Sequence, residues 1–577
     1  RPICCCFREI HRVTQNRSKY DTSADWHIRF SPDCVKISNA SSGTNVTSGF
    51  LEIQCTTTTN GTDIKLKEYI ASVVPPEIHT NKTRAKVEYW HGERVDSGED
   101  DQMEIKKRAS LPPNVLILGI DSTSRLHMYR SLKETKEFLM ENDFVEMRGY
   151  TKTGVNTFPN MMSILGGMEE NHYPCWKDKK NFLDDCPLIW KNFSSSNYIT
   201  ALLEDSAGIA NFNYMKTGFL EQPTDYYFRP VTVAYHDKLS HAYSYSGCVG
   251  GMTQTNFMLQ YLQDFVVEMG RNEVPYFLLS WFSTLGHQDI NNLKPMDSTF
   301  RQVLSDFVNE ESYNSNNTII FFISDHGYRF GSYRETFLGY YEDSLPFFYV
   351  RIPPTLKLSH PDWWDNLRIN SHRLTSPLDL HATLEDILSL NYASSAKKPF
   401  PFTHSNWDAS WRQVYSFFEE TPLNRSCVSS GVPQLYCRCG VTPTADTISN
   451  SSIKFGEFVI KAVNGLLLEF ILNDTCVPLQ FSKFLYRREL SEGEVWNNFG
   501  ELITYEDHLV GLEATPSKAH FEARVWLFQN DTMMLIGDVS RINSYKGQND
   551  CIKDYTLKNF CMCRNYWLKF RTQKIGK

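Results

Sequence analysis

Five short apolar runs divide the middle of this chain, and they restrict its fold more than any other feature. They are NVLILGID at 114–121, YITALLED at 198–205, PYFLLSWFST at 275–284, TIIFFISDHG at 318–327 and LPFFYVRIPP at 345–354. Runs of this length, rich in β-branched and aromatic residues, are typical of strands buried on both faces. Segments of helical period lie between them, such as 256–270 and 298–310. Strands that alternate with helices predict an α/β fold with a doubly wound, mostly parallel sheet.

The chain has 577 residues, more than one ordinary domain needs, and three parts are expected. Residues 1–110 are polar and irregular in pattern, and we interpret them as a glycosylated N-terminal extension that ends in the charged run 97–108. The α/β domain would occupy 111–400, and a smaller disulfide-bearing α+β subdomain 401–577. Within the latter, GEFVIKAVNGLLLEFIL at 456–472 alternates and contains Asn-Gly, so it predicts strands joined by a turn.

Cysteines and glycosylation sequons indicate the compartment. The chain has 15 cysteines, and N-x-S/T triplets begin at Asn16, Asn39, Asn45, Asn60, Asn81, Asn192, Asn316, Asn424, Asn450, Asn473 and Asn530. Together they predict a secreted, extracellular or secretory-pathway lumenal protein with attached N-glycans and several disulfides. The Cys-x-Cys pairs at 437–439 and 561–563 could instead bind zinc, but they lack the usual partner spacing, which favours disulfides.

Net charge and hydropathy exclude several partners. The net charge of −8 and the isoelectric point near 6.1 give no general attraction to nucleic acid. No stretch of about 20 apolar residues predicts a membrane span. A signal peptide or N-terminal membrane anchor could precede Arg1, and the cysteines at 4–6 could flank such an anchor. The basic tail at 565–577 could contact an acidic glycan or phosphate-bearing surface, or simply be solvated.

Polar side chains stand where two of the predicted strands end. Asp121 closes the first run, and Asp325 and His326 close the fourth. Carboxyl ends of parallel strands lie at one edge of a sheet, where ligands bind in such folds. Carboxylates and imidazole held there suit a divalent metal. Taken singly, Asp121 could cap a helix and residues 325–327 could form a turn.

The stretch TGVNTFPNMM at 153–162 predicts a helix start. Pro159 suits the first turn, where its missing N–H has no intrahelical partner. Thr157 would then lie at or just outside the N-terminus, facing backbone N–H groups that can hold an anion. The alternative is that Thr157 or Asn156 is only a helix cap.

Three segments, in this order, resemble the alkaline phosphatase and sulfatase superfamily. They are NVLILGIDSTSR, NTFPNMMSILGG and FFISDHGYRFGSYRETFLGYYEDSLPFFYVRIPP, and within the superfamily they most resemble the animal family called domain of unknown function 229. The resemblance extends from about 111 to 390, and more loosely beyond. By position it implies that Asp121, Asp325 and His326 are metal ligands, and that Thr157 is both the nucleophile and a further ligand. The implied cofactor is a divalent metal, zinc before manganese or calcium.

Departures from the family pattern limit what the resemblance implies. Sulfatases have a Cys, oxidised to formylglycine, where this chain has Thr157, so a phosphorus-centred reaction is favoured. They commonly have a second acid where Ser122 stands, which makes an all-oxygen calcium site poorer. In STLGHQD at 283–289, Ser283 replaces an Asp of two-metal relatives while His287 remains. One metal site is therefore well supported, and a second is uncertain.

The resemblance also implies residues that contact the substrate. His287 would bind phosphoryl oxygens or protonate the leaving group, unless it is an ordinary core or surface histidine. Asn160 would face phosphate, as in related diesterases. Arg125 could bind an anion bidentately, although a surface salt bridge is an alternative. His381 is interpreted as structural.

These patterns lead to one main hypothesis and two competitors. The first is a secreted metal-dependent hydrolase or transferase that acts on a phosphate mono- or diester through a covalent phospho-Thr157. Its substrate would be a phosphorylated or sulfated small molecule, a lipid headgroup or a glycan. The second is a sulfatase-like glycan hydrolase without formylglycine. The third is a catalytically inactive binding ectodomain, suggested by Ser122 and Ser283 in place of acids.

Overall fold

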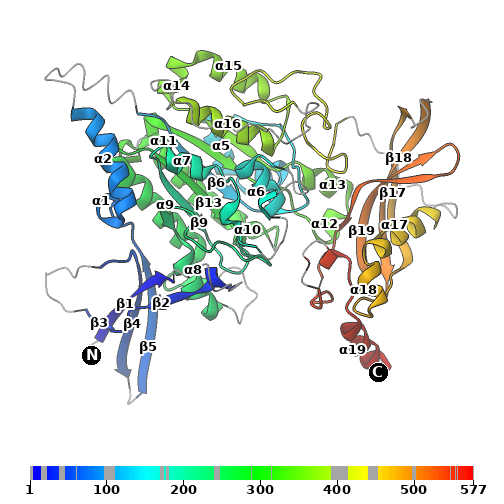
Figure 1. Ribbon diagram of the computed structural model, residues 1–577, viewed down its shortest axis with the longest axis horizontal. Helices are drawn as coiled ribbons and strands as arrows, with labels where there is room; N and C mark the ends of the chain where they lie inside the picture. The colour runs from blue at the N-terminus through cyan, green and yellow to red at the C-terminus, as the bar shows by residue number, and fades with distance from the viewer. Residues whose placement is uncertain are drawn as a thin grey trace. The chain divides into compact units, whose positions relative to one another are not determined.

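The structure is a computed structural model that describes residues 4–13, 23–37, 46–59, 62–95, 111–168, 174–176, 181–239, 247–287, 289–313, 315–390, 413–439, 453–496, 502–545, 547–552, 554 and 557–575. Many of its elements are labelled in Figure 1. The chain divides into two compact units. The first combines Arg1–Gly327 with Leu345–Gly431, and the second combines Tyr328–Ser344 with Val432–Lys577. This division differs from the three predicted parts, because the residues before 110 belong to the first unit.

A seven-stranded sheet forms the centre of the first unit. Its order is β10 (Tyr226–Tyr227), β9 (Ile199–Glu204), β13 (Tyr276–Phe282), β6 (Asn114–Ile120), β14 (Thr318–Ile323), β15 (Phe348–Arg351) and β7 (Val145–Glu146). The first five strands run parallel, while β15 and β7 pair antiparallel at one edge. Every residue of β6, β9, β13 and β14 is buried. The predicted mostly parallel sheet is therefore confirmed.

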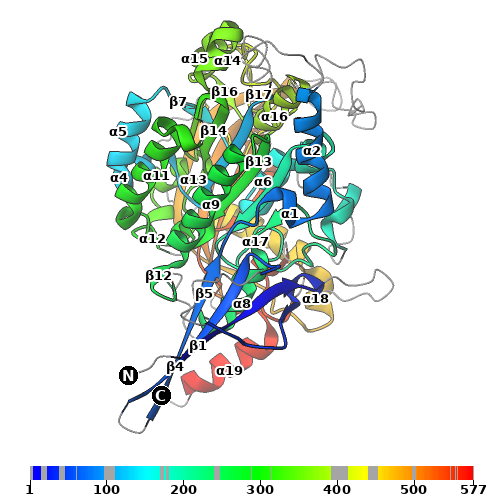
Figure 2. The ribbon, with the colours of Figure 1, turned by 90° about the vertical axis from the view of Figure 1, so that its left-hand side faces the viewer.

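Helices cover both faces of this sheet. On one face, alternate strand residues such as Leu116 and Leu278 share a core with α4 (Arg125–Ser131), α5 (Lys133–Glu141), α8 (Arg229–Leu239), α9 (Gln254–Arg271) and α11 (Asp297–Asn309). Figure 2 shows α9 and α11 on the near side of the strands. On the opposite face, Phe193 of α7 (Trp190–Ser195) stacks on Phe277, with ring centroids 4.6 Å apart. The sheet is thus doubly wound, as predicted.

Further helices and strands belong to the first unit. They are α1 (Pro76–His79), α2 (Asn81–Val95), β8 (Gly149–Tyr150), β11 (Cys248–Val249), β12 (Met252–Thr253), α14 (Pro354–Ser359), α15 (Pro361–Asn370), β16 (Leu374–Thr375) and α16 (Pro377–Leu390). Among the described residues of the whole chain, no helix combines the length and apolar character required to cross a bilayer.

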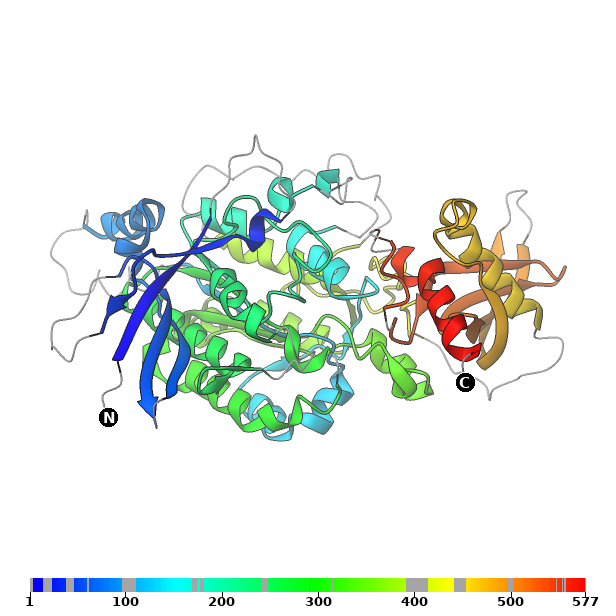
Figure 3. The ribbon, with the colours of Figure 1, turned by 90° about the horizontal axis from the view of Figure 1, so that it is seen from below.

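The N-terminal residues form a second, antiparallel sheet rather than the irregular extension that their composition predicts. Its strands are β1 (Cys4–Arg12), β2 (Ile28–Phe30), β3 (Val35–Lys36), β4 (Phe50–Thr59) and β5 (Thr62–Ala71). Figure 3 shows β1, β4 and β5 as long ribbons. Disulfides Cys5–Cys55 and Cys6–Cys34 staple β1 to its neighbours. The charged run 97–108 lies outside the described residues.

Asp25 joins this N-terminal part to the larger sheet. Its side chain is buried and accepts hydrogen bonds from Arg12 at 3.0 Å, from Asn213 Nδ2 at 2.8 Å and from the Tyr227 hydroxyl at 3.0 Å. Arg229 Nε lies 3.6 Å from the same carboxylate. Because Tyr227 lies in β10, and Asn213 and Arg229 lie before and after it in the sequence, the N-terminal sheet is an integral part of the first unit.

The second unit contains a four-stranded antiparallel sheet. Its order is β17 (Gln480–Trp496), β18 (Leu502–Thr515), β19 (Ala519–Phe528) and β20 (Met533–Arg541). Its helices are α12 (Gly331–Arg334), α13 (Phe337–Ser344), α17 (Ile453–Leu466), α18 (Leu468–Leu472) and α19 (Arg564–Ile575). These elements confirm an α+β subdomain.

The prediction of strands over 456–472 is wrong, because the segment forms α17 and α18. Phe455, Val459 and Val463 recur every four residues, and all three are buried against the sheet. Asn464 does not start a turn. Its side chain instead donates to Leu479 O at 2.8 Å and accepts from Leu479 N at 2.9 Å.

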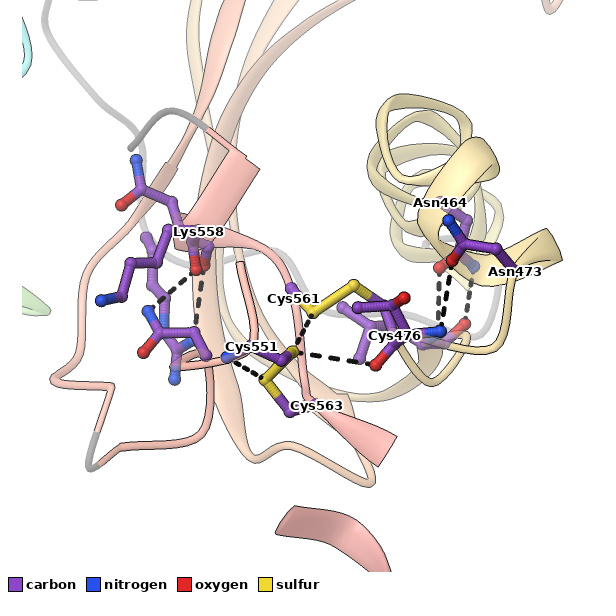
Figure 4. The surroundings of a disulfide bond; sticks show 12 residues. Asn464, Asn473, Cys476, Cys551, Lys558, Cys561 and Cys563 are labelled. Carbon is purple, nitrogen blue, oxygen red and sulfur yellow. Dashed lines mark hydrogen bonds between the residues drawn. A yellow bond between two sulfur atoms is a disulfide. The ribbon is translucent and has the colours of Figure 1, made fainter. Parts of the chain in front are cut away.

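The disulfide interpretation is confirmed for the Cys-x-Cys pair at 561–563, and for one cysteine of the pair at 437–439. In the second unit, Cys476 pairs with Cys561 and Cys551 with Cys563, so both cysteines of the 561–563 pair are bonded (Figure 4). Cys427 and Cys437 are disulfide-bonded as well. In the first unit, Cys175 pairs with Cys186. Among the described cysteines, Cys4, Cys248 and Cys439 are free and exposed.

Candidate active site

Asp121, Asp325 and His326 meet at the carboxyl edge of the first unit's sheet. Asp121 follows β6, and the other two come just after β14, which pairs in parallel with β6. Their ligand atoms all lie within 4.8 Å of one another. His326 Nε2 is 3.1 Å from Asp325 Oδ2 and 3.8 Å from Asp121 Oδ1. All three side chains are buried, so the fold gathers two carboxylates and an imidazole away from bulk water.

Thr157 reaches the same group from a different element. It is the first residue of α6 (Thr157–Gly166), and its N-cap Asn156 makes no side-chain capping bond. The Thr157 hydroxyl lies 3.3 Å from Asp121 Oδ1 and 3.4 Å from His326 Nε2. Unlike the three buried residues, Thr157 is only half-buried. The hydroxyl is therefore aimed at the acid and imidazole group while a path to solvent remains.

Asn160 has a different role from the one expected. Its side chain is fully buried, and its Oδ1 accepts from the backbone N–H groups of Thr153 and Gly154, both at 2.9 Å. Its Nδ2 donates to Gly154 O at 3.0 Å and to Asn156 O at 2.8 Å. Because the loop uses both ends of the amide, Asn160 does not face a phosphate. It fixes the loop that leads into Thr157 instead.

Gly154 allows this loop to lie against the helix. A Cβ atom at Gly154 would lie 2.4 Å from the Cβ of Pro159, far inside contact distance. The helix start and the preceding loop can pack only because the side chain is missing. Gly154, Asn160 and Pro159 together set the position of Thr157.

Ser122 links the carboxylates of the two strands. Its N–H donates to Asp325 Oδ1 at 3.0 Å, and its hydroxyl donates to Asp121 Oδ1 at 2.7 Å. The residue adopts a left-handed φ of 58°, which a serine tolerates only with some strain. In the sequence, Ser122 was noted only because it stands where sulfatases commonly have a second acid. The structure shows it as a donor that orients both aspartates.

The orientation of His326 is set by its neighbour. Nδ1 donates to Gly327 O at 2.7 Å, so Nε2 faces Asp121 and Asp325. Burial raises the pKa of the Asp325 carboxyl; nearby His326 opposes this rise, and the charge of Asp121 adds to it.

The residues present fit a divalent cation. Asp325 Oδ2 is buried and receives no hydrogen bond from the described residues, which leaves one carboxylate oxygen without a donor. Two carboxylates, one imidazole nitrogen and one hydroxyl form a mixed nitrogen and oxygen donor set of the kind that zinc and manganese accept.

The surroundings of His287 place it next to the strand that ends in Asp121. It follows α10 (Ser283–Gly286), whose last residue packs on Asp121: a Cβ on Gly286 would lie 1.9 Å from Asp121 O. His287 itself is half-buried. Its part in proton transfer or phosphoryl binding stays a prediction.

Arg125 and His381 make structural contacts. Arg125 Nη1 donates to Arg148 O at 2.8 Å, which ties α4 to the segment before β8. Its proposed contact with substrate stays a prediction. His381 Nδ1 donates to Ile164 O at 2.8 Å, and its ring fills the space beside Gly167 at the end of α6. That contact agrees with the structural interpretation of His381.

Asp205 is a buried residue that the sequence reasoning overlooked. It follows β9 directly and accepts hydrogen bonds from the start of α10. The signal was available, because Asp205 ends the run YITALLED at the same sheet edge as Asp121. Only the pairing of β9 with β13 shows which neighbour it meets.

Asp121, Thr157, Asp325 and His326 thus lie together at the carboxyl edge of a doubly wound sheet. Residues 3–485 match the family described as "Protein of unknown function (DUF229)", and the chain belongs to that family. Comparison with curated proteins gave no match.

Several solved structures are similar to this chain at low identity. The phosphonate monoester hydrolase from Silicibacter pomeroyi is 11% identical with a TM-score of 0.38, over 72% of this chain and 89% of the hydrolase. The lipooligosaccharide phosphoethanolamine transferase A from Neisseria meningitidis is 11% identical with a TM-score of 0.33, over 52% and 61%. A sulfatase from Pseudoalteromonas sp. is 13% identical with a TM-score of 0.33, over 52% and 71%.

Proposed function

We propose that this chain is a metal-dependent hydrolase or transferase that acts on a phosphate mono- or diester, with Thr157 as its nucleophile. One observation carries the proposal. The Thr157 hydroxyl lies 3.3 Å from Asp121 and 3.4 Å from His326, at the start of a helix and at the edge of the sheet where ligands bind in α/β folds.

Asp121, Asp325 and His326 would hold the cation, zinc or manganese. When bound, a divalent cation would lower the pKa of the nearby hydroxyl and withdraw charge from the group being transferred. Ser122 and Gly327 orient these ligands through hydrogen bonds to Asp121, Asp325 and His326. Outer partners of this kind usually affect metal affinity strongly.

The chain's own residues account for the remaining steps. The oxygen of Thr157 forms a bond to phosphorus while the bond from phosphorus to the leaving oxygen breaks, and Asp121 Oδ1, 3.3 Å away, accepts the hydroxyl proton. His287 protonates the leaving oxygen. N–H groups in the first turn of α6 face the charged oxygens. Water, or the hydroxyl of an acceptor molecule, then cleaves phospho-Thr157 and restores the residue.

Phosphorus is preferred to sulfur because of the residue at 157. Formylglycine is made from cysteine, and this chain has threonine there. The substrate would be a phosphorylated small molecule, a lipid headgroup or a glycan, in keeping with the resemblance. A sulfated compound would fit only the sulfatase-like alternative.

A small substrate panel tests the proposal. The full chain would be assayed with zinc, manganese or chelator on p-nitrophenyl phosphate, bis-p-nitrophenyl phosphate and p-nitrophenyl sulfate. We expect metal-dependent release from a phosphate ester and at least a thousandfold loss in Thr157→Ala. Preference for the sulfate would support the sulfatase-like alternative. Full activity of Thr157→Ala would exclude this nucleophile, and absence of both turnover and bound metal would favour a binding ectodomain.

We also propose a secretory location with N-linked glycans. Disulfides such as Cys5–Cys55 and Cys476–Cys561 form in oxidising compartments. Among the described sequons, those with exposed asparagines are Asn81, Asn316, Asn424, Asn473 and Asn530. Those at Asn16, Asn39, Asn45, Asn60 and Asn450 lie outside the described residues. Expression in animal cells tests the proposal: we expect the chain to lose mass on treatment with a peptide N-glycosidase, and an unchanged mass would contradict it.

A further inference from the structure

Asp205 binds the first turn of α10 from the neighbouring strand. Its Oδ1 accepts from Ser283 N at 2.9 Å, and its Oδ2 accepts from Thr284 N at 3.2 Å and from the Thr284 hydroxyl. The first N–H groups of a helix have no partner inside it. Asp205 therefore caps α10, although it lies just after β9, 78 positions before Ser283 in the sequence.

The other end of α10 is pressed against the metal-ligand strand. A Cβ on Gly286 would lie 1.9 Å from Asp121 O and 3.2 Å from Thr123 Oγ1. Asp121 N also donates to Phe282 O, just before α10, at 3.1 Å. The four residues of α10 are thus fixed between Asp205 and the turn after β6. His287 is the next residue, so its position depends on both contacts.

A buried carboxylate is more than helix capping alone requires. Asp205 is fully buried, and this burial raises its pKa to about 6 although three donors stabilise the charged form. Neutral serine or asparagine caps a helix about as well without a buried charge. Ser283, at the start of α10, is also buried, and it has a hydroxyl where two-metal relatives have a carboxylate. Three hydrogen bonds to a carboxylate that directly follows a buried strand fix the direction of α10 more firmly than one local cap would.

We propose that Asp205 is a positioning residue that acts through α10 to hold His287 toward the leaving group. This inference rests on the proposed function, in which His287 donates a proton to the leaving oxygen. It adds a residue from a third strand of the sheet to the site. Asp205 itself touches neither the substrate nor the cation.

The test compares two substrates and uses a double-mutant cycle. Phenyl phosphate has a poor leaving group and needs protonation, whereas p-nitrophenyl phosphate needs little. We expect Asp205→Asn and His287→Ala each to lower kcat/KM for phenyl phosphate about thirtyfold, and for p-nitrophenyl phosphate less than fivefold. In the His287→Ala background, Asp205→Asn should lower kcat/KM for phenyl phosphate by less than a further threefold. The proposal would be overturned if the loss of kcat/KM in the double variant equalled the product of the two single losses. It would also be overturned if Asp205→Asn lowered kcat/KM equally for both substrates.

Asp184 provides a matched control. Its carboxylate also accepts from two consecutive backbone N–H groups, those of Leu220 at 2.8 Å and Glu221 at 2.9 Å. Asp184→Asn should leave the ratio of kcat/KM for phenyl phosphate to kcat/KM for p-nitrophenyl phosphate unchanged. Thr284→Val, which removes one donor to Asp205 and is a milder change, should lower phenyl phosphate turnover by an intermediate factor.

Hydrogen exchange provides a measurement that does not require turnover. In Asp205→Asn, amides of residues 283–287 should exchange at least tenfold faster than in the wild-type chain, while those of 121–126 keep their rate. If the wild-type chain cleaves no phosphate ester, the proposed function fails while this exchange pattern still tests the hold on α10. Unchanged exchange at 283–287 would overturn the role of Asp205 in either case.

Discussion

The hydroxyl of Thr157 lies 3.4 Å from Nε2 of His326, although 169 positions separate the two residues. One belongs to the start of a helix and the other to a buried strand end. The parallel pairing of β6 with β14 brings Asp121 to the same point. A hydroxyl with access to solvent therefore faces two buried carboxylates and an imidazole, which is the relationship that the proposed phosphoryl transfer requires.

Replacement of Thr157 should separate catalysis from folding. Thr157→Ala removes the hydroxyl from a half-buried position, so we expect kcat to fall by at least a thousandfold while the urea midpoint changes little. Thr157→Ser keeps the nucleophile and should retain more than a tenth of the activity. Trapping with ³²P-labelled substrate, followed by peptide mapping, should place the label on residue 157. Label on another residue would contradict the assignment.

Loss of the Ser122 hydroxyl should weaken metal binding. Ser122→Gly keeps the N–H bond to Asp325 and suits the φ of 58°, but it removes the bond to Asp121. We expect zinc affinity to fall about 10- to 100-fold by isothermal titration calorimetry. Ser122→Ala loses the same bond and adds backbone strain, so it should bind no better than Ser122→Gly. Affinity equal to that of the wild-type chain would show that Ser122 does not orient the ligand.

The buried carboxylate of Asp25 should be essential for the N-terminal sheet. Asp25→Asn leaves Arg12 and Arg229 without their charge partner in a buried site, so we expect a loss of about 3–5 kcal/mol in urea unfolding. Asp143→Asn is the matched control. Asp143 pairs with Lys357 at 2.8 Å but is largely exposed, and its loss should cost under about 1 kcal/mol. Equal effects of the two substitutions would contradict the prediction.

Glu204 should make stability fall as pH rises toward neutrality. Burial raises its pKa from 4.5 to about 7. Because the folded state binds the proton more tightly, the stabilising contribution is complete below about 4.5 and is lost as pH rises through 7. We expect the free energy of unfolding to fall by up to roughly 3 kcal/mol between pH 4.5 and 8 from this group. In Glu204→Gln, the free energy of unfolding should fall less steeply with pH over this range. Equal pH dependence in the variant and the wild-type chain would contradict this role of Glu204.

The sequence predicts the central sheet well because its strands are unambiguous. The cores of the runs 114–121 and 318–327, at 115–118 and 319–323, are apolar throughout and rich in β-branched and aromatic residues, which favours buried strands. The N-terminal strands were missed for the opposite reason. β4 is rich in threonine and depends on pairing and disulfides for its stability. At 456–472 the Asn-Gly signal outweighed the period of four residues, which was the better guide to α17.

Some residues of the candidate site could be predicted from the sequence, and the roles of others could not. Strand ends placed Asp121, Asp325 and His326, because topology alone brings those ends together. The roles of Asn160 and Asp205 depend on loop conformation and on side-chain direction, which motifs do not encode. Asn160 could have faced outward in a looser loop. Only the hydrogen bonds to Thr153 and Gly154 show that it turns inward.

A crystal structure of the zinc-loaded chain, with anomalous data collected above and below the zinc edge, tests the shared site most directly. We predict one strong peak about 2.0–2.2 Å from oxygens of Asp121 and Asp325 and from Nε2 of His326, with the Thr157 oxygen also in contact. The proposal would be contradicted if zinc bound fully at other positions but gave no anomalous peak at Asp121, Asp325 and His326. It would also be contradicted if the Thr157 hydroxyl lay more than about 4 Å from the ion.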